Sequence, residues 1–259
     1  MQIEGFDQFH FTDDRKTRTV FRRGHGPAVV IMHEIPGITP EVAGFGRRVA
    51  DSGFTAFLPW MFGTPGKPLS TPYALGQMLR ACISSEFYCL SERRSSPITD
   101  WLRALARHVH AECGGPGVGA IGMCLTGGFA LSMMIDETIM APVLSQPSCP
   151  FPITASRRGA IAISDEELAK VRERVRAGCP VLGLRFTGDP VCPPERFETL
   201  RRELGDGFEG IEIDSSPGNK FGIKPKAHSV LTVDFVDREG HPTKDALDRV
   251  LQFFKDRLN

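Results

Sequence analysis

The sequence predicts an α/β fold with a largely parallel central sheet and helices on both faces. Short apolar runs alternate with segments of helical periodicity, which is typical of strands linked by helical crossovers. The run at 28–32, AVVIM, is apolar at every position, as expected of a strand covered on both faces. No linker, internal repeat or low-complexity tract interrupts this alternation, so we expect a single domain over residues 1–259.

Capping patterns place two of the helices. Thr39 and Pro40 suit an N-cap and a first helical position, which predicts a helix directly after the first strand. Ser164 and Glu167 form a capping-box pattern at the start of another helix. The remaining elements are expected as strands at 54–58, 117–122, 181–186 and 208–213, as helices at 73–90, 97–113, 126–135, 193–204 and 245–258, and as Gly-, Pro- and Ser-rich loops at 60–72 and 215–225.

Composition narrows the classes of partner. The chain has 259 residues with 31 basic and 31 acidic side chains, so without a bulk positive field we expect no nucleic-acid partner. No basic start leads into an apolar run, and no stretch approaches about 18 apolar residues, so neither a signal peptide nor a membrane partner is predicted. Seven scattered cysteines fit a reducing cytoplasm better than a disulfide framework. We expect a cytoplasmic protein, as a monomer or a small homo-oligomer.

The segment 122–128, GMCLTGG, lies between a predicted strand and a predicted helix. A nucleophile at such a junction, a nucleophile elbow, stands exposed at the carboxyl end of its strand, and small neighbours clear the space around it. The following helix directs N–H groups and a positive dipole end to the same point, which lowers the pKa of a thiol. Cys124 is therefore the candidate nucleophile. The alternative is a small buried side chain, like the other six cysteines.

An acid and a base follow Cys124 in the chain order that this kind of fold uses. Asp189 comes directly after the predicted strand 181–186, and His228 lies in a loop after the strand 208–213. Because the carboxyl ends of parallel strands share one edge of the sheet, the three side chains can meet there. Taken alone, Asp189 suits a turn and His228 suits a surface loop. The ordered trio favours a nucleophile that is served by a base and an orienting acid.

Four short segments carry a family resemblance: HEIPG at 33–37, GMCL at 122–125, TGD at 187–189 and AHS at 227–229. From Val29 to the C-terminus the chain resembles the dienelactone hydrolases, which are α/β-hydrolases with a Cys-Asp-His triad. The resemblance implies the α/β-hydrolase fold and a hydrolase of a small ester or lactone that needs neither a cofactor nor a metal ion.

The resemblance also implies a role for each site residue. Cys124 would attack the carbonyl carbon, His228 would shuttle the proton, and Asp189 would fix the imidazole tautomer. Glu34 would contact the resting Cys124 and exchange its proton with the thiol, since a carboxylate beside a thiolate suppresses ionisation. The alternative for Glu34 is an ordinary carboxylate in a surface loop. Its place after a fully apolar strand, at the edge where ligands gather, favours the functional interpretation.

Backbone groups are expected to stabilise the oxyanion. The N–H of Leu125, which follows the nucleophile, and the N–H of Ile35 match the donors of the family.

Two positions depart from the family pattern. Thr126 stands where the elbow has glycine, and Thr232 stands where the founding enzymes carry an arginine that holds a substrate carboxylate.

Three further side chains are candidates for substrate binding. Trp60 suits the wall of an apolar acyl site, although it suits the core equally well. Arg80 and Arg93 lie in a region that could supply another clamp for a carboxylate.

Two motifs are set aside. The glycines of 117–122, GVGAIG, run into a strand, whereas a dinucleotide fingerprint needs a strand before them and a helix after them. His108, His110 and Cys113 resemble metal ligands, but residues two apart do not share a helix face, so no metal site is expected.

Two other classes of function stay open. One is a small-molecule binder or thiol redox sensor on the same fold, which would keep Cys124 reactive without catalysis. The other is a related hydrolase, such as a thioesterase or a peptidase.

Overall fold

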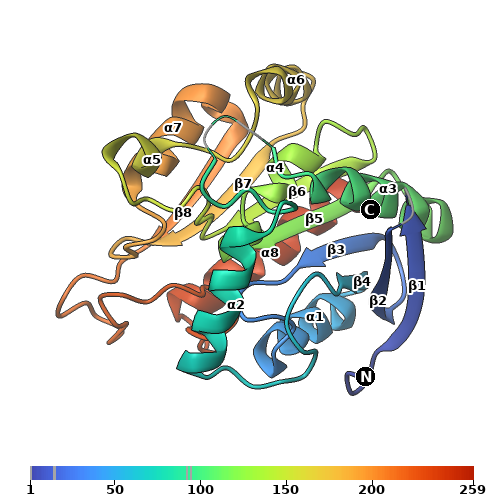
Figure 1. Ribbon diagram of the computed structural model, residues 1–259, viewed down its shortest axis with the longest axis horizontal. Helices are drawn as coiled ribbons and strands as arrows, with labels where there is room; N and C mark the ends of the chain where they lie inside the picture. The colour runs from blue at the N-terminus through green and yellow to red at the C-terminus, as the bar shows by residue number, and fades with distance from the viewer. Residues whose placement is uncertain (1, 14–15, 92, 94) are drawn as a thin grey trace.

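The computed structural model describes residues 2–13, 16–91, 93 and 95–259. Eight strands form one sheet in the order β1-β2-β4-β3-β5-β6-β7-β8 (Figure 1). Strand β2 runs antiparallel to both of its neighbours, and the strands from β4 to β8 are parallel. The strands are β1 (Asp7–Asp13), β2 (Lys16–Gly24), β3 (Ala28–Met32), β4 (Thr55–Pro59), β5 (Val118–Met123), β6 (Ile139–Ser145), β7 (Val181–Phe186) and β8 (Phe208–Ile213).

Helices cover both faces of this sheet. Val30 of β3 packs in one apolar cluster with side chains of α3 and α4, whereas Val29 and Ile31 pack in a second cluster with side chains of α1 and α8. This alternation along a fully buried strand is expected of a sheet covered on both sides. The helices are α1 (Pro40–Asp51), α2 (Thr71–Ile83), α3 (Ile98–Cys113), α4 (Phe129–Met133), α5 (Ala155–Gly159), α6 (Asp165–Arg176), α7 (Pro194–Leu204) and α8 (Pro242–Leu258).

Both predicted helix starts are capped, but the capping box predicted at Ser164 and Glu167 is only half formed, because the Ser164 N–H donates to the Ser95 hydroxyl at 3.1 Å and not to Glu167. The side chain of Thr39 accepts a hydrogen bond from the Val42 N–H at 3.4 Å, and Pro40 is the first residue of α1. Ser164 accepts from the Glu167 N–H at 3.2 Å at the start of α6. Each cap satisfies a donor that the first turn of a helix leaves without a partner.

Two predicted helices are wrong in extent. The helix expected at 73–90 ends at Ile83, because the chain then turns back to bury Phe87 and Cys89. The Cys89 thiol lies 3.5 Å from the Ala81 carbonyl oxygen. The helix expected at 126–135 divides into a 3-10 turn at Cys124–Thr126 and the short helix α4. The pair Gly127 and Gly128 between them weakens helix continuity.

Three strands were not predicted. The hairpin β1–β2 is half-exposed at the edge of the sheet and rich in polar residues, so it lacks an apolar run. Strand β6 lies inside the sheet although it contains Pro142, a residue that normally argues against an interior strand.

None of the helices in the described ranges combines the length and apolar character that crossing a bilayer requires.

Candidate active site

Cys124 lies on a strained turn at the carboxyl end of β5. All six residues of the strand are buried, and Cys124 has φ +56°, in the left-handed region that non-glycine residues rarely adopt. A side chain on Gly122 would collide with the carbonyl oxygen of Thr126, and one on Gly127 would collide with Pro147. The small neighbours predicted for a nucleophile elbow are therefore required by its packing.

Thr126 explains how the turn tolerates a β-branched residue. Its hydroxyl accepts from the Met123 N–H at 2.9 Å and lies 2.9 Å from the Met32 carbonyl oxygen, to which it donates. It thereby ties the turn after β5 to the end of β3. The side chain is fully buried, so its hydroxyl fills hydrogen-bonding positions that a glycine would leave open.

Asp189 and His228 meet after β7 and β8. The His228 Nδ1 lies 2.6 Å from the Asp189 Oδ2, and the Asp189 side chain is fully buried. Asp189 also accepts from the Val191 N–H at 2.9 Å, which fixes its second oxygen. An ionised carboxylate can only accept, so it fixes a proton on Nδ1, and Nε2 is the acceptor whenever the ring is neutral.

The His228 Nε2 is buried, and Cys124 is the side chain besides Asp189 that interacts with the ring. Burial disfavours the charged ring, but the charge of Cys124 and the hydrogen bond to Asp189 outweigh it and hold the pKa of His228 well above its usual value. Cys124, Asp189 and His228 therefore come together at the sheet edge where the sequence predicted them.

Glu34 is also at this edge, directly after β3, and is only 2% exposed. It accepts hydrogen bonds from the Ser229 hydroxyl at 2.7 Å, from the Gln146 amide at 3.3 Å and from the Thr232 hydroxyl. Burial raises the pKa of Glu34, although the bond from Thr232 and the nearby His228 oppose the shift. None of its hydrogen bonds in the described ranges goes to Cys124, the partner that the family resemblance implies.

His33 fixes the loop that carries Glu34. Its Nε2 accepts from the Met61 N–H at 3.1 Å and its Nδ1 lies 3.2 Å from the Glu34 carbonyl oxygen, so the ring is neutral with its proton on Nδ1. Burial lowers the pKa of His33 to about 4. The ring also packs edge-on against Phe62 at 4.3 Å between centroids.

Gln146 is a site residue that the sequence did not reveal. It follows β6, is fully buried and has φ +35°, an unusual value for a residue with a side chain. Besides its bond to Glu34, its N–H donates to the Leu184 carbonyl at 2.7 Å, and two residues later the Ser148 N–H donates to the Cys124 carbonyl at 2.9 Å. Because β6 was not predicted, no local pattern identified this turn.

The two predicted backbone donors lie at the expected points of the chain. Leu125 belongs to the 3-10 turn that starts at Cys124, and Ile35 follows Glu34 in the loop after β3. Their action on an oxyanion stays a prediction.

The three candidate substrate residues occupy different places. Trp60 is half-buried, donates its indole N–H to the Gly63 carbonyl at 2.9 Å and lines a cavity of about 340 Å³ together with Arg18. Arg93 is bound at the surface by Asp165, with 2.8 Å from Nε to Oδ1, and three quarters of its side chain is exposed. Arg80 is exposed on α2. Among the residues that the structure describes, neither arginine forms a hydrogen bond to Glu34 or His228.

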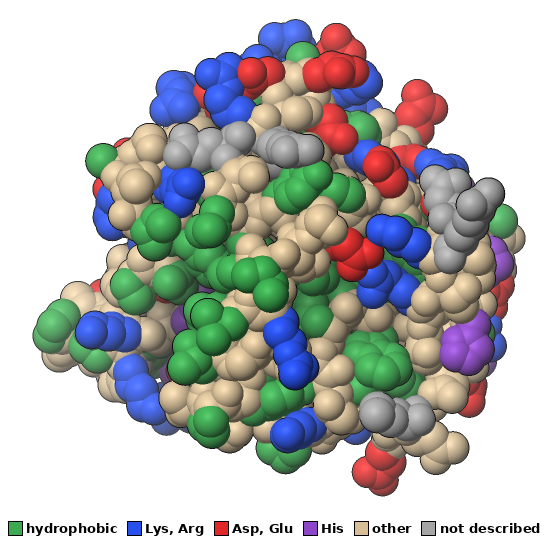
Figure 2. Space-filling view, viewed as in Figure 1, with side chains coloured by type: hydrophobic (Ala, Val, Ile, Leu, Met, Phe, Trp, Pro, Cys, Tyr) green, Lys and Arg blue, Asp and Glu red, His purple; other side chains and the backbone are tan. Residues whose placement is uncertain are grey.

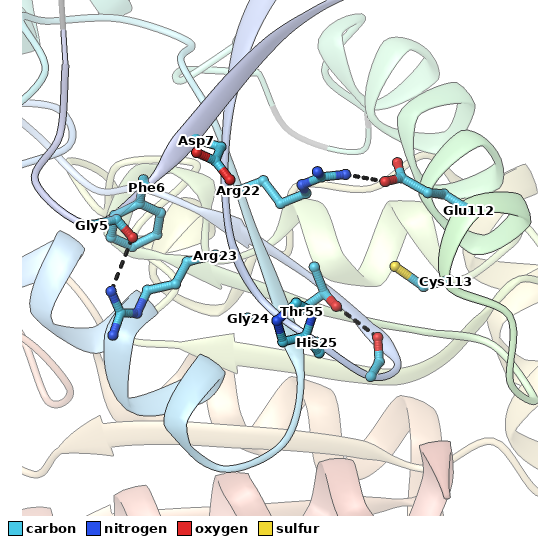
Figure 3. A pocket seen from close by; sticks show the side chains of 11 residues that line it. Gly5, Phe6, Asp7, Arg22, Arg23, Gly24, His25, Thr55, Glu112 and Cys113 are labelled. Atoms are coloured by element: carbon cyan, nitrogen blue, oxygen red, sulfur yellow. Dashed lines mark hydrogen bonds and ion pairs between the residues drawn. The ribbon is translucent and has the colours of Figure 1, made fainter.

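A separate cavity of about 780 Å³ lies where β2 ends and β4 begins (Figure 3). Two of its arginines have partners within the protein: Arg22 binds Glu112, and Arg23 donates to the Gly5 carbonyl at 3.0 Å. It contains none of the predicted site residues. In the described ranges, no three His, Cys, Asp or Glu side chains lie where they could hold a metal ion.

Comparison with known proteins identifies the family. The model of the dienelactone hydrolase family matches residues 17–258. The chain belongs to the dienelactone hydrolase family. This match confirms the resemblance carried by the four short segments.

Individual members agree with this family. A Saccharomyces cerevisiae protein named "Putative carboxymethylenebutenolidase" is 23% identical over 181 residues, which cover 70% of this chain and 63% of the relative. The chain thus spans less than two thirds of that relative. Two solved structures share the α/β-hydrolase fold at 16% identity. A "Putative Dienelactone Hydrolase" from Klebsiella pneumoniae subsp. pneumoniae has TM-score 0.64, with 96% of this chain and 98% of the other covered. A dienelactone hydrolase-like promiscuous phosphotriesterase from metagenomic libraries has TM-score 0.63, with 98% of each chain covered.

Proposed function

We propose that this family member is a carboxylic ester hydrolase that cleaves a small ester or lactone with Cys124 as the nucleophile. The observation that supports this best is the position of His228. One ring nitrogen is held 2.6 Å from buried Asp189. The other is also buried, and Cys124 interacts with the ring closely enough to raise its pKa. The names of the family and of its relatives support the substrate class.

The proposed reaction has two halves. His228 Nε2 takes the thiol proton, and the sulfur of Cys124 adds to the ester carbonyl carbon to give a tetrahedral oxyanion. The C–O bond to the alcohol then breaks, and the departing oxygen takes the proton from His228. Water, deprotonated by His228, attacks the resulting thioester, and the C–S bond breaks to release the carboxylic acid and restore the thiol. The N–H groups of Ile35 and Leu125 are the proposed oxyanion donors.

Glu34 is proposed to act from a fixed position. Its three donors come from the segment after β6 and from the segment after His228, so direct proton exchange with Cys124 would require Glu34 to leave them. A carboxylate held beside Ser229 instead stabilises positive charge on the neighbouring His228 ring as it takes up the proton.

The proposal is tested with a chromogenic ester such as p-nitrophenyl acetate. The wild type should release a burst of p-nitrophenol, and Cys124→Ala should abolish both the burst and turnover. Cys113→Ala is the matched control, because Cys113 is partly exposed and lies in the separate cavity. Unchanged turnover in Cys124→Ala would remove Cys124 from the mechanism. Rapid labelling of Cys124 by iodoacetamide without hydrolysis across a panel of esters would favour a thiol sensor or binder instead.

A further inference from the structure

The exposed apolar side chains of this protein are concentrated on one segment. Of the nine large apolar side chains that are exposed among the described residues, six lie between positions 69 and 90. The three most exposed of these six are Ile83 at 86%, Leu79 at 60% and Leu75 at 56%. Concentrated apolar exposure on a soluble domain marks an interaction surface more often than scattered exposure does.

Helix α2 organises this surface. Leu75, Leu79 and Ile83 are spaced four residues apart and therefore share one side of the helix, with Met78 beside them. The buried residues of α2, Gln77 and Ala81, face the protein. The helix lies across the front of the molecule, and apolar side chains gather over this region (Figures 1 and 2). We call the side formed by Leu75, Met78, Leu79 and Ile83 the α2 face.

Two stretches of chain carry basic residues and no acidic residue. Residues 52–85 contain Lys67 and Arg80 but no acidic residue. Residues 215–233 contain three lysines and no acidic residue, and none of these lysines forms an ion pair within the described ranges. We call the three the lysine loop: Lys220, Lys224 and Lys226. Lys220 lines a cavity of about 330 Å³ together with Glu212, Asp214 and Asp245, so the positive charge of this loop rests mainly on Lys224 and Lys226.

Hydrogen bonds and a ring contact connect both segments to the same end of the sheet. The Tyr73 hydroxyl of α2 accepts from the Thr64 N–H at 2.6 Å, in the loop that follows β4. Phe62 of that loop packs against His33, next to Glu34. The segment after the lysine loop reaches Glu34 through Ser229. The α2 face and the lysine loop therefore border the edge that carries the candidate active site.

The side chains of this surface favour one kind of binding partner over the others. A symmetric dimer through this surface would place like charges opposite one another, because a twofold interface brings the same patch of both copies together. Protein interfaces favour aromatic residues and disfavour lysine, whereas the α2 face presents aliphatic side chains, with Arg80 on the same helix and Lys67 over the Tyr73 ring. Aliphatic residues on an amphipathic helix flanked by basic residues suit a surface of anionic lipid.

We propose that the α2 face and the lysine loop dock this protein on an anionic lipid surface. The aliphatic side chains enter the boundary between headgroups and acyl chains, and the lysines approach the negative headgroups. The absence of a spanning segment, on which the expectation of no membrane partner was based, does not bear on docking by a surface helix. The proposal is independent of the chemistry at Cys124.

The test is flotation of the full-length protein with vesicles. One preparation is phosphatidylcholine alone and the other is equimolar phosphatidylcholine and phosphatidylglycerol, each at about 0.05 M and about 0.5 M salt. We expect binding to the anionic vesicles at low salt, with a marked loss at high salt and weak binding to the neutral vesicles. Equal binding to both compositions, or no binding to either, would overturn the proposal.

Two variants assign the binding to the surface. Lys220→Gln/Lys224→Gln/Lys226→Gln should weaken partitioning to anionic vesicles by up to about 100-fold. Leu79→Ser/Ile83→Ser should weaken it by at least about 10-fold, through lost apolar contact. The thermal unfolding midpoint shows that each variant stays folded, and both side chains of the second variant are largely exposed.

A matched control removes the same charge elsewhere. Lys170→Gln/Lys244→Gln/Lys255→Gln takes away three lysines on α6 and α8, and it should change partitioning by less than about 3-fold. If this control weakened partitioning as much as the lysine-loop variant does, net charge alone would explain the binding. That result would contradict the assignment of binding to the lysine loop. Sedimentation that reveals a dimer, dissociated by Leu79→Ser/Ile83→Ser, would contradict it too, by showing that a second copy covers the α2 face.

Discussion

At the residue scale, the turn at Cys124 depends on one hydroxyl. Thr126 accepts from the Met123 N–H and donates to the Met32 carbonyl, and all three groups are buried. The sequence showed only that Thr126 departs from the elbow pattern. Its partner on β3 lies 94 positions away, and a contact of that range follows from topology and not from local pattern.

Thr126→Val tests the contribution of this hydroxyl to stability. The substitution keeps the shape and leaves a buried donor and acceptor without partners, so the free energy of unfolding should fall by about 2–3 kcal/mol. Urea unfolding measures the change. Thr17→Val, at an exposed position of β2, should stay within about 0.5 kcal/mol of the wild type. A loss as small as that of the control would show that the hydroxyl is dispensable.

The pKa of His228 is a second test at this scale. The charge of Cys124 is the strongest influence that raises this pKa, so Cys124→Ala should lower it and shift the loss of the ring proton to lower pH. Titration of the imidazole by NMR follows the change. Cys113→Ala should leave the titration in place. A His228 pKa that does not move in Cys124→Ala would contradict the proximity of the two side chains.

At the scale of elements, the sequence predicted what local pattern encodes. The strands β3, β7 and β8 have the bounds predicted, because each is bordered by turn residues. The strands of the hairpin and β6 were missed, because their pairing in the sheet outweighs weak or contrary local preference. The same miss concealed Gln146, whereas Cys124, Asp189 and His228 were predicted, because each follows a strand or loop that was itself predicted.

The segment after β6 is held by one buried arginine. Arg196 of α7 donates to the carbonyls of Pro147 and Pro150 at 2.6 Å each, and to the carbonyl of Ala160 at 2.9 Å. Pro147 in turn packs on Gly127, beside the Cys124 turn. The guanidinium thus holds in place the segment that packs against the Cys124 turn.

Arg196→Lys should separate the contribution of the guanidinium hydrogen bonds to stability from that of the positive charge. Lysine keeps the charge but cannot reach several carbonyls with a planar fork, so the free energy of unfolding should fall by about 2–4 kcal/mol. Chemical denaturation measures it, with Arg202→Lys at an exposed position of α7 as the control. Equal effects of the two substitutions would mean that the fork makes no special contribution.

At the scale of the whole molecule, the candidate site residues gather at one edge of the sheet. Chain order alone predicted that a nucleophile, an acid and a base would meet there, because parallel strands direct their carboxyl ends to one side. The hydrogen bonds around these residues could be identified only from the three-dimensional structure. They involve the side chains of Thr126, Gln146, Ser229 and Thr232. That residues 1–259 form a single domain stays a prediction.

During turnover, a substrate acyl group should reside on Cys124. Acid quench of the enzyme during the burst with p-nitrophenyl acetate, followed by mass spectrometry of the peptides, detects this intermediate. We expect one acetyl group on the peptide that contains Cys124, absent in Cys124→Ala and retained in Cys113→Ala. Steady hydrolysis with the acetyl group on another residue, or with the same turnover in Cys124→Ala, would exclude Cys124 as the nucleophile.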